Sequence, residues 1–273
     1  MWCYMVTDFL CSHIPVDDMG HLYGFGLFET FLVNKNSSVL LLDRHIDRLF
    51  KSISFFDFDI DIKKDEFEFM LLKHIENNRI KDKVLRVSIT YGNKYKNIKP
   101  SMRINLRDNP YISKEIYSKG FKLTVSKYKK NESSPIISHK TANYMENYLA
   151  CQHAVQNGFD DTIFLNTKNK ITETTKSNIF FISNGIIYTP DIRCGILPGI
   201  IRDWIIEKSE GMGIKCQQGK YTIKMLMESD EIFVTNSVMG IMPVYCVEDY
   251  VMTGGLPGKI TNLFLTEYQK KMG

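Results

Sequence analysis

The most restrictive feature of this sequence is the stretch from residue 135 to 202, where helix, strand and turn signals follow one another closely. Lys140 lies near its start. Apolar side chains then recur at i, i+4, i+7 and i+11, which is the spacing of one face of a helix; they are Tyr144, Tyr148, Cys151 and Val155. Gly158 is the expected C-cap. The pattern therefore predicts a helix with one apolar face directly after Lys140.

The remainder of this stretch predicts strands and a second helix. Residues 162–165 are typical of a short strand, and 179–182 form an apolar run. Asn184-Gly185 follows that run and predicts a tight β-hairpin. Leu197-Pro198-Gly199 then opens a helix that continues through Trp204. The stretch is thus expected to be mixed α/β.

The order of residue types in this stretch resembles the fold-type IV pyridoxal-phosphate (PLP) enzymes, also called class IV aminotransferases. That family comprises branched-chain aminotransferases, D-amino-acid aminotransferases and aminodeoxychorismate lyases. The matching positions are Lys140, Asn143, Gly158, Glu173, Ser177-Asn178-Ile179-Phe180, Thr189-Pro190 and Leu197-Pro198-Gly199-Ile200-Ile201-Arg202. By position alone, Lys140 and Glu173 would be ordinary exposed side chains. The shared order of so many matches favours a functional interpretation, because it is more specific than any single match.

The resemblance implies a role for each matched group. PLP forms a Schiff base with a lysine amine, and that lysine would be Lys140. A carboxylate that holds the proton of the cofactor's ring nitrogen would be Glu173. The phosphate would accept hydrogen bonds from the start of the second helix, at Ile200 and Ile201. The family often has Thr at position 201, and isoleucine retains only the main-chain donor. Tyr144 would hydrogen-bond the cofactor's phenolic oxygen.

Two matches lie in the N-terminal part of the chain. The segment from His21 to Thr30 contains a resemblance to the family signature Y-G-D-G-x-[FY]-E-T, with Phe25 in place of Asp. On local grounds it is a tight turn leading into a strand. Phe28 stands where aminotransferases of the family often have a Tyr, so it offers no hydroxyl. The segment His45–Leu49 matches H-x-x-R-L, which implies that Arg48 binds the phosphate.

Two features of the chain distinguish lyases from transaminases within the family. Residues 236–244 read N-S-V-M-G-I-M-P-V, close to the lyase pattern N-S-[LV]-x-[GP]-[IV]-M-P-V. Transaminases tend towards S-T-x-x-E-[IV]-T-P-V or G-T-x-x-E-[IV]-T-P-V. Asn236 and Ser237 are implied to contact the phosphate. Tyr91 replaces an arginine that often binds the substrate carboxylate in transaminases; Lys94, Lys96 and Lys99 are candidate substitutes, although a solvated loop is the commoner role of such charges.

Composition excludes several other classes of protein. The chain has 273 residues, 44% of them hydrophobic and 24% charged, which is ordinary for a globular protein. The net charge of +4 is small, and the lysine-rich run 127–130 is expected to be a solvated loop and not a nucleic-acid site. The six cysteines form no C-x-x-C pair and no zinc-type cluster, so no metal is expected. The first 20 residues lack Lys and Arg, which argues against a secretory signal or a mitochondrial presequence. No apolar run is long enough to span a membrane.

We therefore predict an α/β (α+β) two-domain protein of fold type IV, similar to D-amino-acid aminotransferase, with PLP in the interdomain cleft. The smaller N-terminal domain would cover residues 1–115 and the larger PLP-binding domain 116–273. The predicted activity is that of a cytoplasmic aminodeoxychorismate lyase, which makes 4-aminobenzoate and pyruvate from 4-amino-4-deoxychorismate for folate synthesis. The resemblance also implies a homodimer. The alternatives are a D-amino-acid or branched-chain transaminase and a non-catalytic protein of the same fold.

Overall fold

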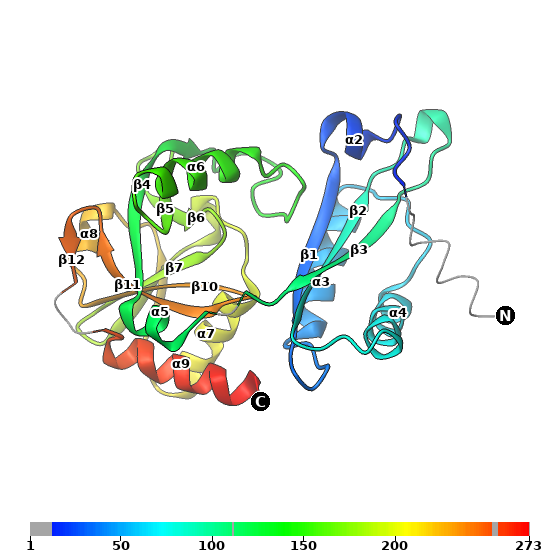
Figure 1. Ribbon diagram of the computed structural model, residues 1–273. Helices are drawn as coiled ribbons and strands as arrows, with labels where there is room; N and C mark the ends of the chain where they lie inside the picture. Colours follow the sequence, from blue (N-terminus) through cyan, green and yellow to red (C-terminus); the bar gives the residue numbers. More distant parts are fainter. Residues whose placement is uncertain (1–12, 111, 253–255, 273) are drawn as a thin grey trace. The chain divides into compact units, whose positions relative to one another are not determined.

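The structure is a computed structural model that describes residues 13–110, 112–252 and 256–272. The chain folds into two compact units (Figure 1). The first unit comprises the chain up to Pro110 together with His139–Asn143, and the second comprises Tyr111–Ser138 and Tyr144–Lys271. The segment that carries Lys140 therefore belongs to the first unit, although the residues on both sides of it belong to the second.

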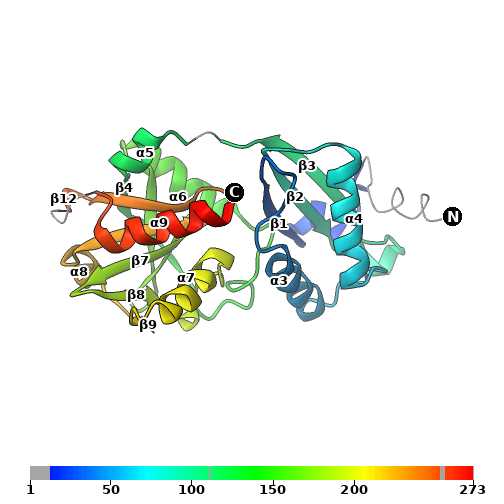
Figure 2. The ribbon, with the colours of Figure 1, turned by 90° about the horizontal axis from the view of Figure 1, so that it is seen from below.

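The first unit is a three-stranded antiparallel sheet covered by two helices. The strands, in the spatial order β1-β2-β3, are β1 (Gly26–Val33), β2 (Lys83–Thr90) and β3 (Met102–Asp108). The helices are α2 (Met19–Tyr23), α3 (Leu42–Phe55), α4 (Lys64–Asn77) and the 3₁₀ turn η1 (Lys94–Lys96). Figure 2 shows α3 and α4 on the same side of this sheet.

The face of each strand decides what packs against it. Successive side chains of a strand point to opposite faces, and Leu27 and Phe31 of β1 are buried in one core cluster with Ile46 of α3 and Leu71 of α4. Phe28 lies on the other face of the sheet and is also buried. Helix α3 begins at Leu42, and its N-cap residue is Leu41, in the left-handed region at φ 54°.

The second unit is built on a nine-stranded mixed sheet. Its spatial order is β6-β5-β4-β11-β10-β7-β8-β9, and β12 pairs with β11. The strands are β4 (Phe121–Lys130), β5 (Asp161–Asn166), β6 (Ile171–Thr174), β7 (Asn178–Ser183), β8 (Ile186–Pro190), β9 (Cys216–Gly219), β10 (Glu231–Asn236), β11 (Gly240–Val247) and β12 (Tyr250–Val251). The helices are α5 (Lys114–Lys119), α6 (Met145–Gln156), η2 (Ile192–Cys194), α7 (Ile200–Gly211), α8 (Ile223–Met227) and α9 (Lys259–Met272).

Helices cover this sheet, which explains the continuous apolar run at 179–182. Within β7, Ile179 and Phe181 belong to one core cluster, while Phe180 stacks on Phe233 of β10 on the other face. Helices α7 and α9 lie side by side in Figure 2, and their contact includes Trp204. A strand buried on both faces has no polar positions to alternate with apolar ones.

Several predicted elements are confirmed. The two-residue turn Asn184-Gly185 joins β7 to β8, with φ values of 52° and 74°. These positive values are those of the turn that an Asn-Gly pair favours. The predicted strand at 162–165 is β5, and the predicted helix after Leu197-Pro198-Gly199 is α7, with Gly199 as its N-cap.

The predicted helix after Lys140 is α6, but the apolar face predicted for it is not its buried face. In α6 the side chains of Tyr148 and Val155 are 66% and 58% exposed. The buried residues are instead Asn147, Ala150 and Ala154. Small side chains allow α6 to pack closely on β4 and β5, so the larger apolar residues project outward.

The lysine-rich run 127–130 is not a solvated loop, because it is the end of β4. Lys130 is only 5% exposed. Its ammonium donates to Asn147 Oδ1 at 2.6 Å and pairs with Glu146 at 3.1 Å. A buried cation needs such partners to offset lost hydration. Among the helices of the described residues, none is both long and apolar enough to cross a membrane.

Candidate active site

Residues 140–143 extend the sheet of the first unit. The Phe28 amide donates to the Lys140 carbonyl at 3.0 Å, and the Ala142 amide donates to the Gly26 carbonyl at 2.8 Å. Between these bonds, Leu27 and Thr141 form an antiparallel bridge. Strand β1 is an edge of the sheet and has main-chain groups that accept this pairing. The register places Lys140 beside Phe28.

Two basic side chains lie over the ring of Phe28. Lys140 Nζ lies 4.5 Å from the ring centroid, and the guanidinium carbon of Arg86 lies 3.6 Å from it. Arg86 also donates through Nε to Ser88 Oγ at 3.1 Å. Arg86 belongs to none of the sequence motifs that resemble the family. Alternation along β2 places Arg86 on one face of the strand but does not say what that face meets.

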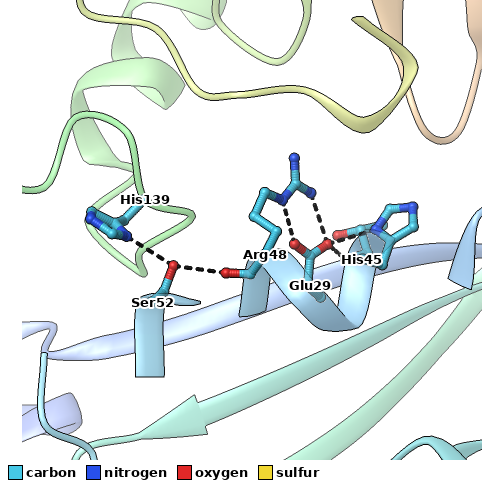
Figure 3. Close-up of polar contacts among 6 residues, drawn as sticks. Glu29, His45, Arg48, Ser52 and His139 are labelled. Atoms are coloured by element: carbon cyan, nitrogen blue, oxygen red, sulfur yellow. Dashed lines mark hydrogen bonds and ion pairs between the residues drawn. The ribbon is translucent and has the colours of Figure 1, made fainter. Parts of the chain in front are cut away.

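Arg48 is held by a buried carboxylate. Its Nε and Nη2 atoms donate to the two oxygens of Glu29, at 2.7 and 2.9 Å (Figure 3). His45 Nδ1 lies 2.9 Å from Glu29 Oε2, and since a carboxylate only accepts, the nitrogen is the donor. Burial acts to raise the pKa of Glu29, but the charge of Arg48 and the bond from His45 outweigh it and hold that pKa well below its usual range. Glu29 fixes the direction of the guanidinium.

In the second unit, Glu173 lies in a closed network of motif residues. Its Oε2 accepts from the Leu197 amide at 3.0 Å and from Asn178 Nδ2 at 3.3 Å. The same Asn178 nitrogen donates to the Leu197 carbonyl at 2.9 Å. Glu173 is 9% exposed, so these bonds hold a carboxylate at a largely buried position. The network joins the end of β6 to the loop before α7.

The start of α7 presents main-chain donors. Ile200 and Ile201 form its first turn with buried side chains. In the part of the chain that the structure describes, no side chain caps this end. A Cβ on Gly199 would lie 1.8 Å from Asn178 Oδ1, so only glycine fits there. First-turn N–H groups without a cap, at the positive end of the helix dipole, suit an anion.

Asn236 organises the loop that contains Ser237. Its Oδ1 accepts from the amides of Val238 and Met239, both at 2.9 Å, and its Nδ2 donates to Ser177 Oγ at 3.1 Å. Tyr117 Oη donates to the Met239 carbonyl at 2.6 Å. Beside this loop, Thr235 Oγ1 is buried and has no partner among the described residues. The loop is thus held by four hydrogen bonds.

The predicted site residues are divided between the two units. Lys140 and Arg48 belong to the first. The second holds Tyr144, Glu173, Ile200, Ile201, Asn236 and Ser237. Tyr144 is the N-cap residue of α6, and its carbonyl accepts from the Tyr148 amide at 2.9 Å. The three lysines named as candidates for binding a substrate carboxylate pair with carboxylates of this chain: Lys94 with Asp57, Lys96 with Asp17 and Lys99 with Asp59.

Comparison with known proteins identifies the family. The family model for amino-transferase class IV matches residues 26–246. The chain belongs to the class IV aminotransferase family. Enzymes of this family depend on PLP, so membership confirms the family and the cofactor that the sequence predicted. The coarse activity follows as well: the chain is an enzyme of the class IV PLP-dependent family.

Individual relatives carry more than one activity. The chain is 30% identical over 263 residues to an aminodeoxychorismate lyase of Bacillus subtilis, with 93% of this chain and 88% of that protein covered. It is equally 30% identical over 256 residues to a putative branched-chain-amino-acid aminotransferase of Methanocaldococcus jannaschii, with 92% and 88% covered. The solved structure of a putative 4-amino-4-deoxychorismate lyase from Legionella pneumophila has a TM-score of 0.86 at 26% identity, with 97% of each chain covered. These likenesses confirm the predicted fold type.

The residues present fit the family's cofactor chemically. An amine suits the aldehyde, a held carboxylate suits a ring N–H, and uncapped N–H groups suit a phosphate. The chain supplies these through Lys140, Glu173 and the first turn of α7. The buried hydroxyl of Thr235, which has no partner in the described part of the chain, is a further polar group beside the loop that contains Asn236 and Ser237.

Proposed function

We propose that this protein is an aminodeoxychorismate lyase that converts 4-amino-4-deoxychorismate to 4-aminobenzoate and pyruvate. The loop between β10 and β11 carries the proposal. Asn236 makes three hydrogen bonds there, two through Oδ1 and one through Nδ2; the glycine of the transaminase patterns has no side chain to make them, and the serine would have to make all three through one oxygen on a shorter side chain. The similarity to the Bacillus subtilis lyase supports the same conclusion.

Gly240 adds a second argument from the same loop. The transaminase patterns have a glutamate at this position. Gly240 has a φ of 68°, and a Cβ on it would lie 2.3 Å from Tyr268 Cε1. A glutamate therefore meets both an unfavourable main-chain conformation and the ring of Tyr268. The loop of this chain is shaped for the glycine of the lyase pattern.

In this proposal each site residue has a defined task. PLP, when bound, supplies an electron-accepting ring that stabilises negative charge on the substrate carbon beside the nitrogen. The amine of Lys140 removes the proton from that carbon and returns a proton to the departing pyruvate enol. Glu173 holds the proton of the ring nitrogen, and Tyr144 donates to the phenolic oxygen. The groups that would hold the phosphate are Arg48, Ser237, the loop ordered by Asn236 and the main-chain N–H groups of Ile200 and Ile201.

Arg86 is the proposed partner of a substrate carboxylate. It shares the ring of Phe28 with Lys140, so it brings a second positive charge to the side chain beside the reacting amine. A guanidinium binds a carboxylate through two parallel hydrogen bonds. Arg86 would thus bind the substrate carboxylate, which Tyr91, at the position of the arginine found in transaminases, has no charge to bind.

The alternative activity is transamination of D- or branched-chain amino acids. The similarity to the Methanocaldococcus jannaschii protein favours it as strongly as identity alone favours the lyase. Purified protein loaded with PLP and given 4-amino-4-deoxychorismate should form 4-aminobenzoate and pyruvate in equal amounts. Transamination of amino and keto acids with no aminobenzoate formed would reject the lyase. A protein that stays colourless after addition of PLP would favour a non-catalytic role.

We further propose that the protein is a cytoplasmic homodimer. Exposed apolar residues gather on α6: Met145, Tyr148, Leu149 and Val155. A second copy that covers this face would remove the apolar surface from water. The cysteines of the described residues, Cys151, Cys194, Cys216 and Cys246, are free thiols, which suits a reducing compartment.

A further inference from the structure

His139, the residue before Lys140, is tied to helix α3 through Ser52. His139 Nδ1 lies 2.9 Å from Ser52 Oγ. Ser52 Oγ donates to the Arg48 carbonyl at 3.1 Å, and the Ser52 side chain is largely buried. Figure 3 shows this chain of contacts next to the Arg48–Glu29 pair. The loop before Lys140 is thus bonded to the helix that carries Arg48.

The direction of the hydrogen bonds follows from the hydroxyl. A serine has one O–H hydrogen, and a carbonyl only accepts. Because Ser52 gives its hydrogen to the Arg48 carbonyl, His139 Nδ1 is the donor to Ser52 Oγ. No bond of Nε2 is found within the described residues. The bond therefore defines the tautomer of a neutral His139.

Phe55, the last residue of α3, and Phe56, which follows it, both pack against the ring of His139. His139 stacks on Phe55 with ring centroids 4.4 Å apart and planes 28° apart. It meets Phe56 edge to face at 4.8 Å. Burial lowers the pKa of His139, which keeps the ring neutral at physiological pH. The imidazole is therefore fixed by one hydrogen bond and by two aromatic contacts.

The rest of the segment is fixed at its other positions. The Lys140 carbonyl accepts from the Phe28 amide, and Asn143 Nδ2 donates to the Gly24 carbonyl at 3.1 Å. His139 supplies the anchor on the N-terminal side. The Lys140 side chain has four rotatable bonds, so its amine finds one position repeatedly only if the main chain that bears it is fixed.

We propose that His139 and Ser52 form a latch that fixes the main chain of Lys140 to α3, which makes His139 a positioning residue for the Lys140 amine. The role deepens the proposed function and rests on it, because it presumes that Lys140 is the reacting amine. His139 itself touches neither cofactor nor substrate in this proposal. Its effect passes through the main chain of the next residue.

Three substitutions separate the hydrogen bond from the ring packing. His139→Phe retains an aromatic ring and removes the donor. Ser52→Ala removes the acceptor. His139→Asn places an amide N–H near the position of Nδ1 and removes the ring. Ser54→Ala, at an exposed serine of the same helix, is the matched control.

The first measurement is hydrogen exchange of the cofactor-free protein, which does not depend on catalysis. The peptide that contains residues 139–143 should exchange about 5- to 10-fold faster in His139→Phe and Ser52→Ala, the factor that loss of one hydrogen bond produces. His139→Asn should exchange more slowly than His139→Phe. Ser54→Ala should match the wild type. Wild-type exchange in both latch variants would overturn the proposal.

The second measurement is steady-state kinetics of the PLP-loaded enzyme. His139→Phe and Ser52→Ala should each lower kcat about 5- to 10-fold with little change in KM, and the double variant should be no worse than either. Additive losses would overturn the latch, because they would show two independent roles. Failure of the proposed function has a different signature, because the PLP-loaded wild type would then form no 4-aminobenzoate, whereas hydrogen exchange of the cofactor-free protein would still report on the latch.

Discussion

The Lys140 carbonyl accepts a hydrogen bond from the amide of Phe28, and the Lys140 ammonium lies 4.5 Å from the centroid of the same residue's ring. One residue of β1 thus fixes both the main chain and the side chain of the lysine. The pairing joins segments far apart in the sequence, and it depends on β1 being an edge strand. The position of the amine therefore depends on the pairing of residues 140–143 with strand β1.

Replacement of Lys140 tests the proposed chemistry directly. Lys140→Ala should abolish the visible absorbance of bound PLP and lower turnover by about 10²–10⁴-fold, the range expected for loss of a proton-transfer group. Absorbance spectra and product assays check both. Lys35→Ala, at an exposed lysine of the same unit, should leave both unchanged. Retention of colour and turnover in Lys140→Ala would contradict the assignment.

Replacement of Arg86 tests the proposed carboxylate contact. Arg86→Met retains much of the packing on Phe28 and removes the charge. We expect kcat/KM for 4-amino-4-deoxychorismate to fall about 10- to 100-fold, mainly through KM, because a charge-assisted hydrogen bond is lost. Arg107→Met on β3 is the control, since Arg107 lies on the same face of the sheet, near its other end. Equal effects of the two substitutions would argue against a specific contact.

The Glu29 carboxylate should make stability depend on pH. Its pKa lies below the ordinary 4.5 in the folded state, so the stabilisation is complete above that pH and is lost as the pH falls below it. Glu29→Gln should lower the free energy of unfolding by about 3–5 kcal/mol at pH 7, because Arg48 and His45 lose their buried partner. The difference in free energy of unfolding between the wild type and Glu29→Gln should narrow by about 1.4 kcal/mol for each pH unit below 4.5.

Urea unfolding from pH 7 to pH 3 measures this dependence. Glu76→Gln is the control, because Glu76 pairs with Lys73 on the exposed surface of α4, where such pairs contribute little. A constant gap between wild type and Glu29→Gln across this range would show that Glu29 is not the group responsible.

Gly240 should tolerate no side chain. Gly240→Ala combines a φ of 68° with a contact of 2.3 Å to Tyr268. Gly185→Ala is matched in main-chain conformation, at φ 74°, but has nothing within 4 Å. We expect Gly240→Ala to be less stable than Gly185→Ala by about 1–3 kcal/mol, the usual range for overpacking. Thermal unfolding compares them, and equal losses would show that Tyr268 yields without difficulty.

The exposed face of α6 should govern self-association. Tyr148→Asp places a charge in the apolar surface that a second copy would cover, so the dimer should dissociate at concentrations where the wild type remains associated. Sedimentation velocity across a dilution series measures this. Lys127→Asp, at an exposed position outside this face, is the control. A monomeric wild type would remove the proposed interface.

Much of the local structure follows from the sequence alone. Asn184-Gly185 predicts its hairpin because few residue pairs adopt two successive positive φ values. Leu197-Pro198-Gly199 predicts the start of α7, since Pro and Gly restrict where a helix begins. The ordered motif from Lys140 to Arg202 predicts the family and the cofactor, which the comparisons confirm. These signals lie in neighbouring residues, so a single segment contains them.

The tertiary structure decided what each side chain meets. Periodicity places Tyr148 and Val155 on one face of α6, but the buried face of α6 is formed by Asn147, Ala150 and Ala154, and the larger apolar residues stay exposed. Lys130 is buried because Asn147 and Glu146 of another element reach it. Arg86 meets Phe28 because β1 pairs with β2, and His139 meets Ser52 because helix α3 and the loop before Lys140 both pack at strand β1. Such contacts depend on chain packing, which a local pattern of residues does not contain.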